Sequence, residues 1–208
     1  MSHYYDPAPQ SASKERLISF EVAGTKIVLH TDNGVFSKTR VDEGSLLLLQ
    51  TIIPLHLSGR ILDLGAGYGT LGAGYGTLGL SIAVTSPEAR VDLAEINTRA
   101  LSLCEKNAKL LKVDQRVTCL QSDIYSNIEG PYDSIVVNPP IRAGKKVTYQ
   151  MYEGAKQHLS DGGSLYLVIR KAQGAESASK YIKELFGNIA LLNRKKGYLI
   201  YQARKETN

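Results

Sequence analysis

A glycine-rich run that follows an apolar stretch is the part of this sequence best suited to binding a nucleotide. Residues 60–64 predict a strand, and this strand leads into Gly65, Gly67 and Gly69. Glycines at this spacing permit a tight turn and close approach of the backbone to a ligand, and a helix that begins after them points its N–H groups at an anion. Asp63, near the end of the strand, could orient the loop or accept a hydrogen bond from the ligand.

The heptapeptide GAGYGTL occurs twice in tandem, at 65–71 and at 72–78. Inside a helix, Gly72, Gly74 and Gly76 would each cost about 1 kcal/mol relative to alanine. A longer surface loop costs less, because closure entropy grows slowly with length. We therefore predict a protruding loop rather than a longer helix. Either copy could form the ligand loop, and both arrangements are expected to alter ligand affinity or the substrate entrance.

Acidic residues follow the next two predicted strands. Glu95 could accept hydrogen bonds from both hydroxyls of a ribose. Such an acid usually follows the loop by about 20 residues. Glu95 lies 19 residues after Gly76 and 26 after Gly69, so removing one copy restores the usual distance. Asp123 could accept from an adenine amino group at the same sheet edge, and a helix or turn cap is an equally good interpretation of this residue.

A proline turn follows the strand predicted at 134–137, in the sequence Asn138, Pro139, Pro140 and Ile141. Two successive prolines fix the backbone and remove two donors, so carbonyl oxygens and the Asn138 amide can be held towards a substrate amino group. Open α/β sheets bind ligands at the carboxyl ends of their strands, where this turn is predicted to lie. The turn is therefore interpreted as part of a site rather than as a structural corner.

Together these motifs resemble class I S-adenosylmethionine-dependent methyltransferases, specifically the small-domain family that includes guanine-N2 methyltransferases of ribosomal RNA. The resemblance covers roughly residues 34–202 and rests on DLGAGYG, on Glu95 followed by Asn97, on Ser122 with Asp123, and on NPPI with the basic residues after it. In that superfamily, the pairing of the glycine loop with NPP implies methylation of an amino group. The tandem repeat has no counterpart in the family pattern.

The resemblance implies S-adenosylmethionine as the cofactor. Asp63, Gly65 and Gly67 would hold its methionine end, Glu95 its ribose and Asp123 its adenine. The complete implied cofactor set is Asp63, Gly65, Ala66, Gly67, Gly72, Gly74, Glu95, Ile96, Asp123 and Asn138.

The resemblance also implies in-line attack by an exocyclic base amine of RNA, most of all guanine N2 of ribosomal RNA, on the sulfonium methyl group. Positioning of the amine and nearby acceptor oxygens would accelerate the reaction, without a metal or a covalent intermediate. Many relatives carry an aromatic residue after the two prolines that stacks on the flipped base, whereas Ile141 has no π-face, so the target base stays open. The implied catalytic residues are Asn138, Pro139, Pro140 and Ile141.

Basic residues after the proline turn are candidates for RNA contacts. Arg142, Lys145 and Lys146 could bind phosphates, and a solvated basic loop is the plainer alternative. The formal charge of +5 and the pI near 9.1 favour an anionic partner such as RNA or a ribosomal particle, although this signal is weak on its own.

Alternating strands and helices predict the fold that would position these residues. We expect an α/β, doubly wound, mostly parallel seven-stranded sheet, with a hairpin at 17–22 and 26–30 and with Asp42 as a cap for a helix at 45–53. The chain divides into an N-terminal extension at 1–40 and a methyltransferase domain at 41–208. The expected strands are 60–64, 90–94, 116–121, 134–137, 164–169, 189–192 and 198–202, and the expected helices after the repeat are 78–84, 98–111, 148–159 and 175–186.

Several classes of protein are disfavoured. Four scattered histidines lack the spacing of a ligand set, so we predict no metal. Cys104 and Cys119 fall in apolar patterns and read as buried, reduced thiols. No apolar run is long enough to span a bilayer, and the N-terminus lacks the pattern of a secretory signal, so a cytoplasmic protein is expected.

Two rival functions remain open. Gly67, Gly69 and Gly72 satisfy the dinucleotide spacing GxGxxG, which would suit a nicotinamide-dependent oxidoreductase but leaves NPP unexplained. An RNA-binding protein of the same fold, with catalysis impaired by the duplicated loop, is the second rival.

Overall fold

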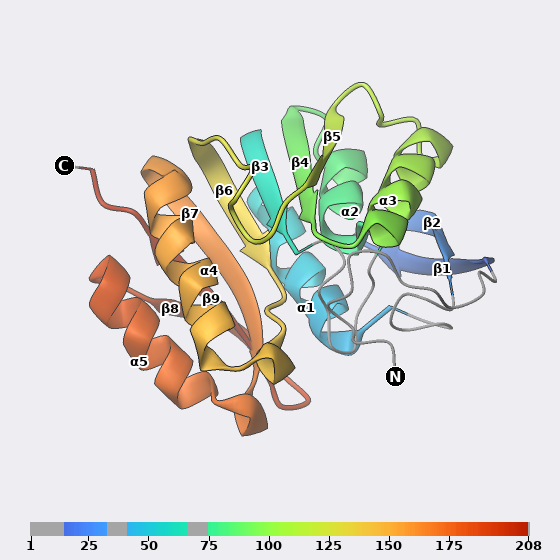
Figure 1. Ribbon diagram of the computed structural model, residues 1–208. Coiled ribbons are helices and arrows are strands. Elements are labelled where there is room, and N and C mark those ends of the chain that lie inside the picture. The colour runs from blue at the N-terminus through green and yellow to red at the C-terminus, as the bar shows by residue number, and fades with distance from the viewer. Residues whose placement is uncertain (1–14, 33–40, 66–74, 208) are drawn as a thin grey trace.

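A twisted sheet lies between two layers of helices in the computed structural model, which describes residues 15–32, 41–65 and 75–207 (Figure 1). An antiparallel hairpin precedes it, formed by β1 (Arg16–Val22) and β2 (Thr25–Thr31). The sheet strands are β3 (Gly59–Leu64), β4 (Ala89–Glu95), β5 (Val117–Gln121), β6 (Tyr132–Val137), β7 (Leu159–Arg170), β8 (Ala190–Lys195) and β9 (Tyr198–Arg204). The helices are α1 (Glu43–Ile52), α2 (Thr77–Thr85), α3 (Thr98–Leu110), α4 (Lys145–His158) and α5 (Ala175–Phe186).

The strand order of the seven-stranded sheet is β5-β4-β3-β6-β7-β9-β8. Strands β3 to β7 pair in parallel, and β9 runs antiparallel to both β7 and β8. The chain winds outwards from β3 in both directions. The predicted doubly wound, mostly parallel α/β fold with an N-terminal hairpin is therefore confirmed.

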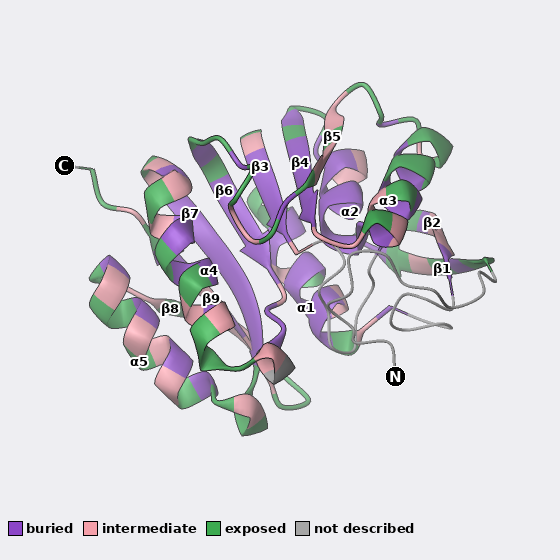
Figure 2. Ribbon diagram, in the orientation of Figure 1, coloured by how far each residue is buried: buried purple, intermediate pink, exposed green. Residues whose placement is uncertain are grey.

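Side chains of successive strand residues point to opposite faces, and each face has its own apolar core. In β3, Ile61 packs with α1, α2 and α3, whereas Leu62 and Leu64 pack with α4 and α5. Figure 2 shows the strands as mostly buried and the outer surfaces of the helices as exposed. Because the central strands are covered on both faces, their functional groups can reach solvent only at the strand ends.

The N-terminal hairpin packs onto the α1–α3 face. Its turn uses left-handed backbone at Ala23 and Gly24, as a two-residue hairpin requires. Its apolar residues, Ile18, Val22, Ile27 and Leu29, are buried in the same cluster as α1, α2 and α3. The predicted hairpin is confirmed, while the domain boundary at residue 40 stays a prediction.

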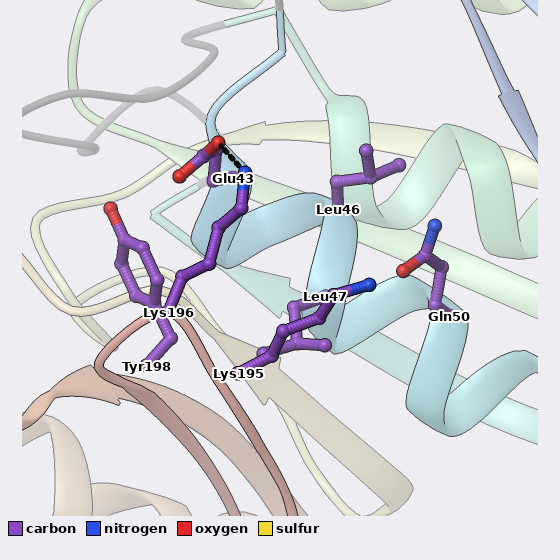
Figure 3. Close-up of a pocket in the computed structure, with 7 residues that line it drawn as sticks. All are labelled: Glu43, Leu46, Leu47, Gln50, Lys195, Lys196 and Tyr198. Atoms are coloured by element: carbon purple, nitrogen blue, oxygen red, sulfur yellow. Dashed lines mark hydrogen bonds and ion pairs between the residues drawn. The ribbon is translucent and has the colours of Figure 1, made fainter.

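The β8–β9 hairpin folds over α1 (Figure 3). Lys196 pairs with Glu43, and the Asn193 side chain donates to Thr51 Oγ1 at 3.0 Å. Lys195 pairs directly with Tyr198, leaving a two-residue turn. This hairpin is therefore tied to both ends of α1.

Several boundaries differ from the sequence prediction, and the differences at α4 and β7 have a clear structural cause. Helix α4 begins at Lys145 instead of 148, because the backbone turns at Gly144 (φ 91°), so two lysines occupy its first turn. Strand β7 begins at Leu159 instead of 164, because Leu159 pairs with Tyr132 and extends the ladder through the glycines that suggested a turn. Among the described residues, no helix is long and apolar enough to span a bilayer.

Candidate active site at the carboxyl edge of the sheet

The predicted site residues gather at one edge of the sheet. Strands β5, β4, β3 and β6 are neighbours and run parallel, so Asp123, Glu95, Gly65 and Asn138 all follow strands at the same edge. Asp63 pairs with Val136 across β3 and β6. The glycine loop and the proline turn therefore leave adjacent strands, as the proposed chemistry requires.

Asp63 is buried beneath the start of α2. Its Oδ2 accepts a hydrogen bond from Gly79 N at 2.8 Å, and only 1% of the residue is exposed. Burial raises the pKa of this carboxyl to about 7, while the Gly79 hydrogen bond acts in the opposite direction. Asp63 thus joins the end of β3 to the first turn of α2 and holds both ends of the loop.

The two copies of the repeat contribute to opposite ends of this loop. Gly65, from the first copy, follows β3 and donates to Ala94 O at 2.9 Å. Gly76, from the second copy, caps α2 in the left-handed conformation (φ 79°), where a Cβ would come within 2.8 Å of Leu80. Helix α2 starts at Thr77, close to the predicted start. The candidate cofactor residues Ala66, Gly67, Gly72 and Gly74, and the predicted protrusion itself, lie outside the described residues.

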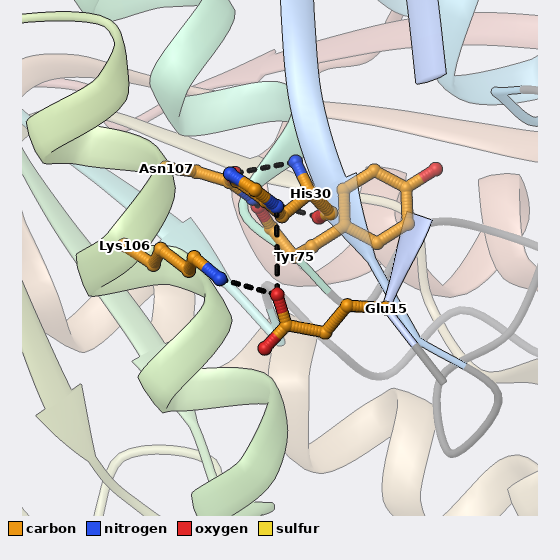
Figure 4. Close-up of polar contacts among 5 residues, drawn as sticks. All are labelled: Glu15, His30, Tyr75, Lys106 and Asn107. Atoms are coloured by element: carbon orange, nitrogen blue, oxygen red, sulfur yellow. Dashed lines mark hydrogen bonds and ion pairs between the residues drawn. The ribbon is translucent and has the colours of Figure 1, made fainter. Parts of the chain in front are cut away.

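Asn107, which the sequence analysis missed, joins this loop to the N-terminal hairpin (Figure 4). Its Nδ2 donates to Tyr75 O at 3.1 Å and to His30 O at 3.0 Å, and its Oδ1 accepts from His30 N at 2.6 Å. Asn107 is fully buried on α3, next to Leu103 and Cys104 in the apolar stripe. The sequence signal for this role was a polar residue within an apolar helix stripe, because a buried amide requires hydrogen-bond partners.

The acids after β4 and β5 differ in exposure. Glu95 is buried and its Oε1 accepts from Asn97 N at 2.7 Å, while Asn97 caps α3. Ile96 is half-buried, and Asp123 is exposed at the end of β5. A pocket of about 230 Å³ lies beside them, lined by Gly65, Ala94, Ser122, Ile124, Val147 and Met151.

Asn138 is oriented by two residues at the start of α1. Its Nδ2 donates to Asp42 Oδ2 at 3.0 Å and to Ser45 Oγ at 2.9 Å. The same Asp42 oxygen accepts from Ser45 N at 2.7 Å and caps the helix, as predicted. Because both amide protons of Asn138 are used, its Oδ1 is the atom left to accept a hydrogen bond from a ligand.

The proline turn is rigid and largely buried. Pro139 O accepts from Ile141 N at 2.9 Å, and a carbonyl oxygen can accept a second bond. Pro139 and Pro140 are buried and Ile141 is half-buried. Lys145 and Lys146 are exposed in the first turn of α4. The side chain of Arg142 lies outside the described part of the chain.

A second pocket, the target pocket, opens beside Asn138. Four distant segments line it: the start of α1, the proline turn, the end of β7 and the start of β9. Its residues are Asp42, Asn138, Pro139, Ile141, Val168, Arg170, Gln173 and Tyr198.

Tyr198 supplies the π-face that Ile141 lacks. It pairs with Arg170 across β7 and β9, and the Arg170 guanidinium carbon lies 5.7 Å from its ring centroid. A Cβ at Gly44 would come within 2.9 Å of the ring, so glycine at this position leaves room for it. Sequence analysis missed Tyr198 because it lies 57 residues beyond Ile141.

Comparison with known proteins identifies the family to which this arrangement belongs. Residues 26–202 match the methyltransferase small domain. The chain belongs to this methyltransferase family. The predicted resemblance is thereby confirmed, and methyl transfer is favoured over the oxidoreductase alternative.

The relatives include an uncharacterized protein of similar length and longer ribosomal RNA methyltransferases. The chain is 38% identical to the uncharacterized protein YbxB of Bacillus subtilis, over 98% of each chain. It is 35% identical to ribosomal RNA small subunit methyltransferase C of Vibrio parahaemolyticus, covering 83% of this chain and 48% of the relative. The chain thus spans about half the length of such curated rRNA methyltransferases.

A solved structure shares the fold closely. The Thermus thermophilus 16S rRNA N2 G1207 methyltransferase RsmC, in complex with AdoMet and guanosine, is similar with a TM-score of 0.80 and 28% identity. The match covers 95% of this chain and 52% of that one. Within the described residues of this chain, no group of three or more His, Cys, Asp or Glu side chains is arranged to hold a metal.

Proposed function

We propose that this protein transfers a methyl group from S-adenosylmethionine to an exocyclic base amine of RNA, most specifically guanine N2 of ribosomal RNA, in the cytoplasm. One observation carries the proposal: the glycine loop and an Asn138 amide with its oxygen left to accept follow adjacent parallel strands. Membership of the methyltransferase small domain family supports the reaction class. The N2-guanine methyltransferase RsmC, similar over half its length, supports the base and the RNA.

The cofactor-side residues fit S-adenosylmethionine. Gly65 begins a loop in which backbone can approach a ligand, and Glu95 follows the neighbouring strand, where a ribose is bound in sheets of this type. Asp123 is exposed at the next strand end and is suited to an adenine amino group. When bound, S-adenosylmethionine supplies an electrophilic methyl group. The remaining candidates, Ala66, Gly67, Gly72, Gly74 and Ile96, stay predictions.

The substrate-side residues suit an attacking amine. Asn138 Oδ1 and the second acceptor position of Pro139 O would accept the two amine protons, which leaves the nitrogen lone pair directed at the methyl group. As the N–C bond formed, the S–C bond of the sulfonium would break to leave a neutral thioether, and positive charge would develop on the nitrogen until one amine proton was released. Those two oxygens, with the Asp42 carboxylate behind Asn138, favour that charge.

The target pocket favours guanine over adenine. It combines the Asp42 carboxylate with the Arg170 guanidinium and the Tyr198 ring. The pairing edge of guanine offers two adjacent donors, N1–H and N2–H, next to the O6 acceptor. With the N2 protons accepted by Asn138 and Pro139, a carboxylate complements the N1–H donor and a guanidinium complements the O6 acceptor. An aromatic ring stacks on an extruded base.

Methyl transfer to ribosomal RNA tests the proposal. RNA from cells lacking the protein would be incubated with purified protein and tritiated S-adenosylmethionine, then digested to nucleosides. We expect label in N2-methylguanosine, with an Arg170→Ala loss of about tenfold or more and no change for the control Lys183→Ala, an exposed residue of α5. Label in methyladenosine would refute the base assignment. No label despite bound cofactor would refute the reaction.

A second candidate, RNA binding with impaired catalysis, is favoured by the tandem repeat. The segment between Gly65 and Tyr75 holds nine residues, whereas a single copy would leave two. If the extra residues obstruct the site, the protein would bind RNA without methylating it. Deletion of residues 72–78 would then create activity that the full chain lacks.

A further inference from the structure

A second groove adjoins the target pocket on the far side of Tyr198. This hairpin groove lies between α1 and the β8–β9 hairpin. Figure 3 shows Glu43 of α1 paired with Lys196 and Leu47 of α1 beside Lys195. Its residues are Glu43, Leu46, Leu47, Gln50, Lys195, Lys196 and Tyr198. Since Tyr198 lines both, the hairpin groove and the target pocket are neighbours.

The walls of the hairpin groove are held in position. Asn193 donates to Thr51 on α1, and Lys171 N donates to Gly197 O in the turn at 2.7 Å. The two-residue turn has left-handed backbone at both positions, with φ 51° at Lys196 and φ 80° at Gly197. A ligand therefore meets a preformed surface and need not order it, which lowers the entropic cost of binding.

Lys196 occupies a position that lysine seldom takes. The first residue of such a turn is usually Asn, Asp or Gly, and another residue in this conformation costs of order 1 kcal/mol. The strained position directs a cation over the groove. Its ion pair with Glu43 is solvent-exposed, with side-chain exposures of 66% and 50%. Exposed pairs of this kind are worth about 0–1 kcal/mol, so a phosphate can replace Glu43 at little cost.

The chemistry of the groove matches a nucleotide. Lys195 and Lys196 lie on one side, and Leu46 and Leu47 form an apolar surface on the other. Tyr198 offers a ring between the two compartments. Cations that follow a backbone, combined with apolar and aromatic surface for bases, are the features by which proteins bind single-stranded nucleic acid.

We propose that the hairpin groove binds the RNA nucleotide next to the target nucleotide, with Lys195 and Lys196 on its phosphates and its base against Leu46, Leu47 and Tyr198. The inference rests on the proposed function, because the target pocket fixes where the neighbouring nucleotide begins. An RNA strand leaving that pocket past Tyr198 enters the groove directly. Lys145 and Lys146 are exposed a few residues after Ile141 and are candidates for contacts to the RNA on the other side of the target nucleotide.

Charge removal in the groove tests the proposal. The double variant Lys195→Ala with Lys196→Ala would be compared with Lys180→Ala with Lys183→Ala, an equal charge loss on exposed positions of α5. The probe is a fluorescein-labelled single-stranded RNA containing one guanine. We expect the groove variant to bind about tenfold more weakly, with a salt slope smaller by about 1.4, since each phosphate contact to a single strand contributes about 0.7. Affinity for S-adenosylmethionine should be unchanged.

The outcomes separate this proposal from the proposed function. If the protein methylates RNA but the groove variant keeps its affinity, salt slope and KM, the groove assignment is overturned alone. Equal losses in the groove and α5 variants would also overturn it, because they would reflect total charge. If binding depends on the groove but no methyl group is ever transferred, the groove assignment stands and the enzymatic proposal fails.

Crosslinking gives a positional test that does not depend on charge. A 4-thiouridine beside the guanine should crosslink, on irradiation, to the tryptic peptide of residues 197–204, which contains Tyr198. Tyr198→Phe keeps the ring and should retain most of the binding, whereas Tyr198→Ala should lose several-fold or more. A crosslink confined to α5 would contradict the groove.

Discussion

The glycine-loop side of the site is formed by residues close to its own motifs, whereas the proline-turn side collects residues from distant segments. On the first side, Asp63 bonds to Gly79 and Glu95 bonds to Asn97. On the second side, Asn138 bonds to Asp42 and Ser45, nearly a hundred residues earlier in the chain. A cofactor site whose residues lie close together in the chain can be recognised from a local sequence pattern. A substrate site formed by distant segments depends on the assembled fold.

Polar groups have different roles on the two sides. Asp63 and Asn107 connect backbone segments and so hold a loop and a hairpin in place. Asp42 instead orients one side chain, Asn138, and leaves an acceptor oxygen directed at a ligand. Loss of the first kind should reduce stability, and loss of the second should reduce turnover. The following predictions test that division.

The largest effect is expected on the substrate side. Asn138→Ala removes an acceptor needed as charge develops on the amine, so kcat should fall about 10²- to 10³-fold. Affinity for S-adenosylmethionine, measured by calorimetry, should change less than about threefold. A variant that lost cofactor affinity and kept its turnover would reverse the two roles.

Asp63→Asn should alter the pH dependence of stability instead. The folded pKa of Asp63 is raised from 3.8 to about 7, so the folded state holds a proton that the unfolded chain has released. Below about pH 4, Asp63 therefore contributes its full amount, up to about 4 kcal/mol, to the free energy of unfolding. This contribution is lost as the pH rises through 7. Urea unfolding at pH 4 to 8 should show the wild type losing stability relative to Asp63→Asn. Parallel curves would contradict a buried, titrating Asp63.

Asn107→Ala should lower the free energy of unfolding by about 2 kcal/mol. It leaves buried backbone groups of His30 and Tyr75 without their partner. The control Lys109→Ala, on the exposed face of the same helix, should stay within about 0.5 kcal/mol. Equal stability of the two variants, measured by urea unfolding, would mean that Asn107 does not hold the hairpin.

Deleting residues 72–78 should have the smallest effect. After the deletion, Tyr68 takes the place of Tyr75, so the segment between Gly65 and this tyrosine shortens from nine residues to two. The loop-closure relation then gives an entropic cost of ordering that is smaller by about 1.3 kcal/mol. If S-adenosylmethionine orders this loop, its affinity should rise by up to about tenfold. Equal affinities and equal turnover of the two chains would show that the repeat is neutral.

The sequence was sufficient to predict the fold, because strands and helices depend on local patterns, and the same patterns suggested the candidate residues of the glycine-loop side. Apolar patterns predicted every strand that the described residues form, and motif residues such as Asp63, Glu95 and Asn138 proved to lie at or just after the carboxyl ends of neighbouring strands. Tyr198, Arg170 and Asn107 could not be predicted as site residues, because their importance arises from strand pairing and from burial. The individual site roles and the bound RNA stay predictions.

The reversed direction of β9 has an evolutionary consequence. Because β9 runs against β7, a hairpin tip arrives at the edge where parallel strands end. That tip could change in length or charge across descendants without disturbing the motifs beneath the cofactor. Diversification of substrates within such proteins would then be concentrated in the β8–β9 turn, with methyl-donor binding left intact.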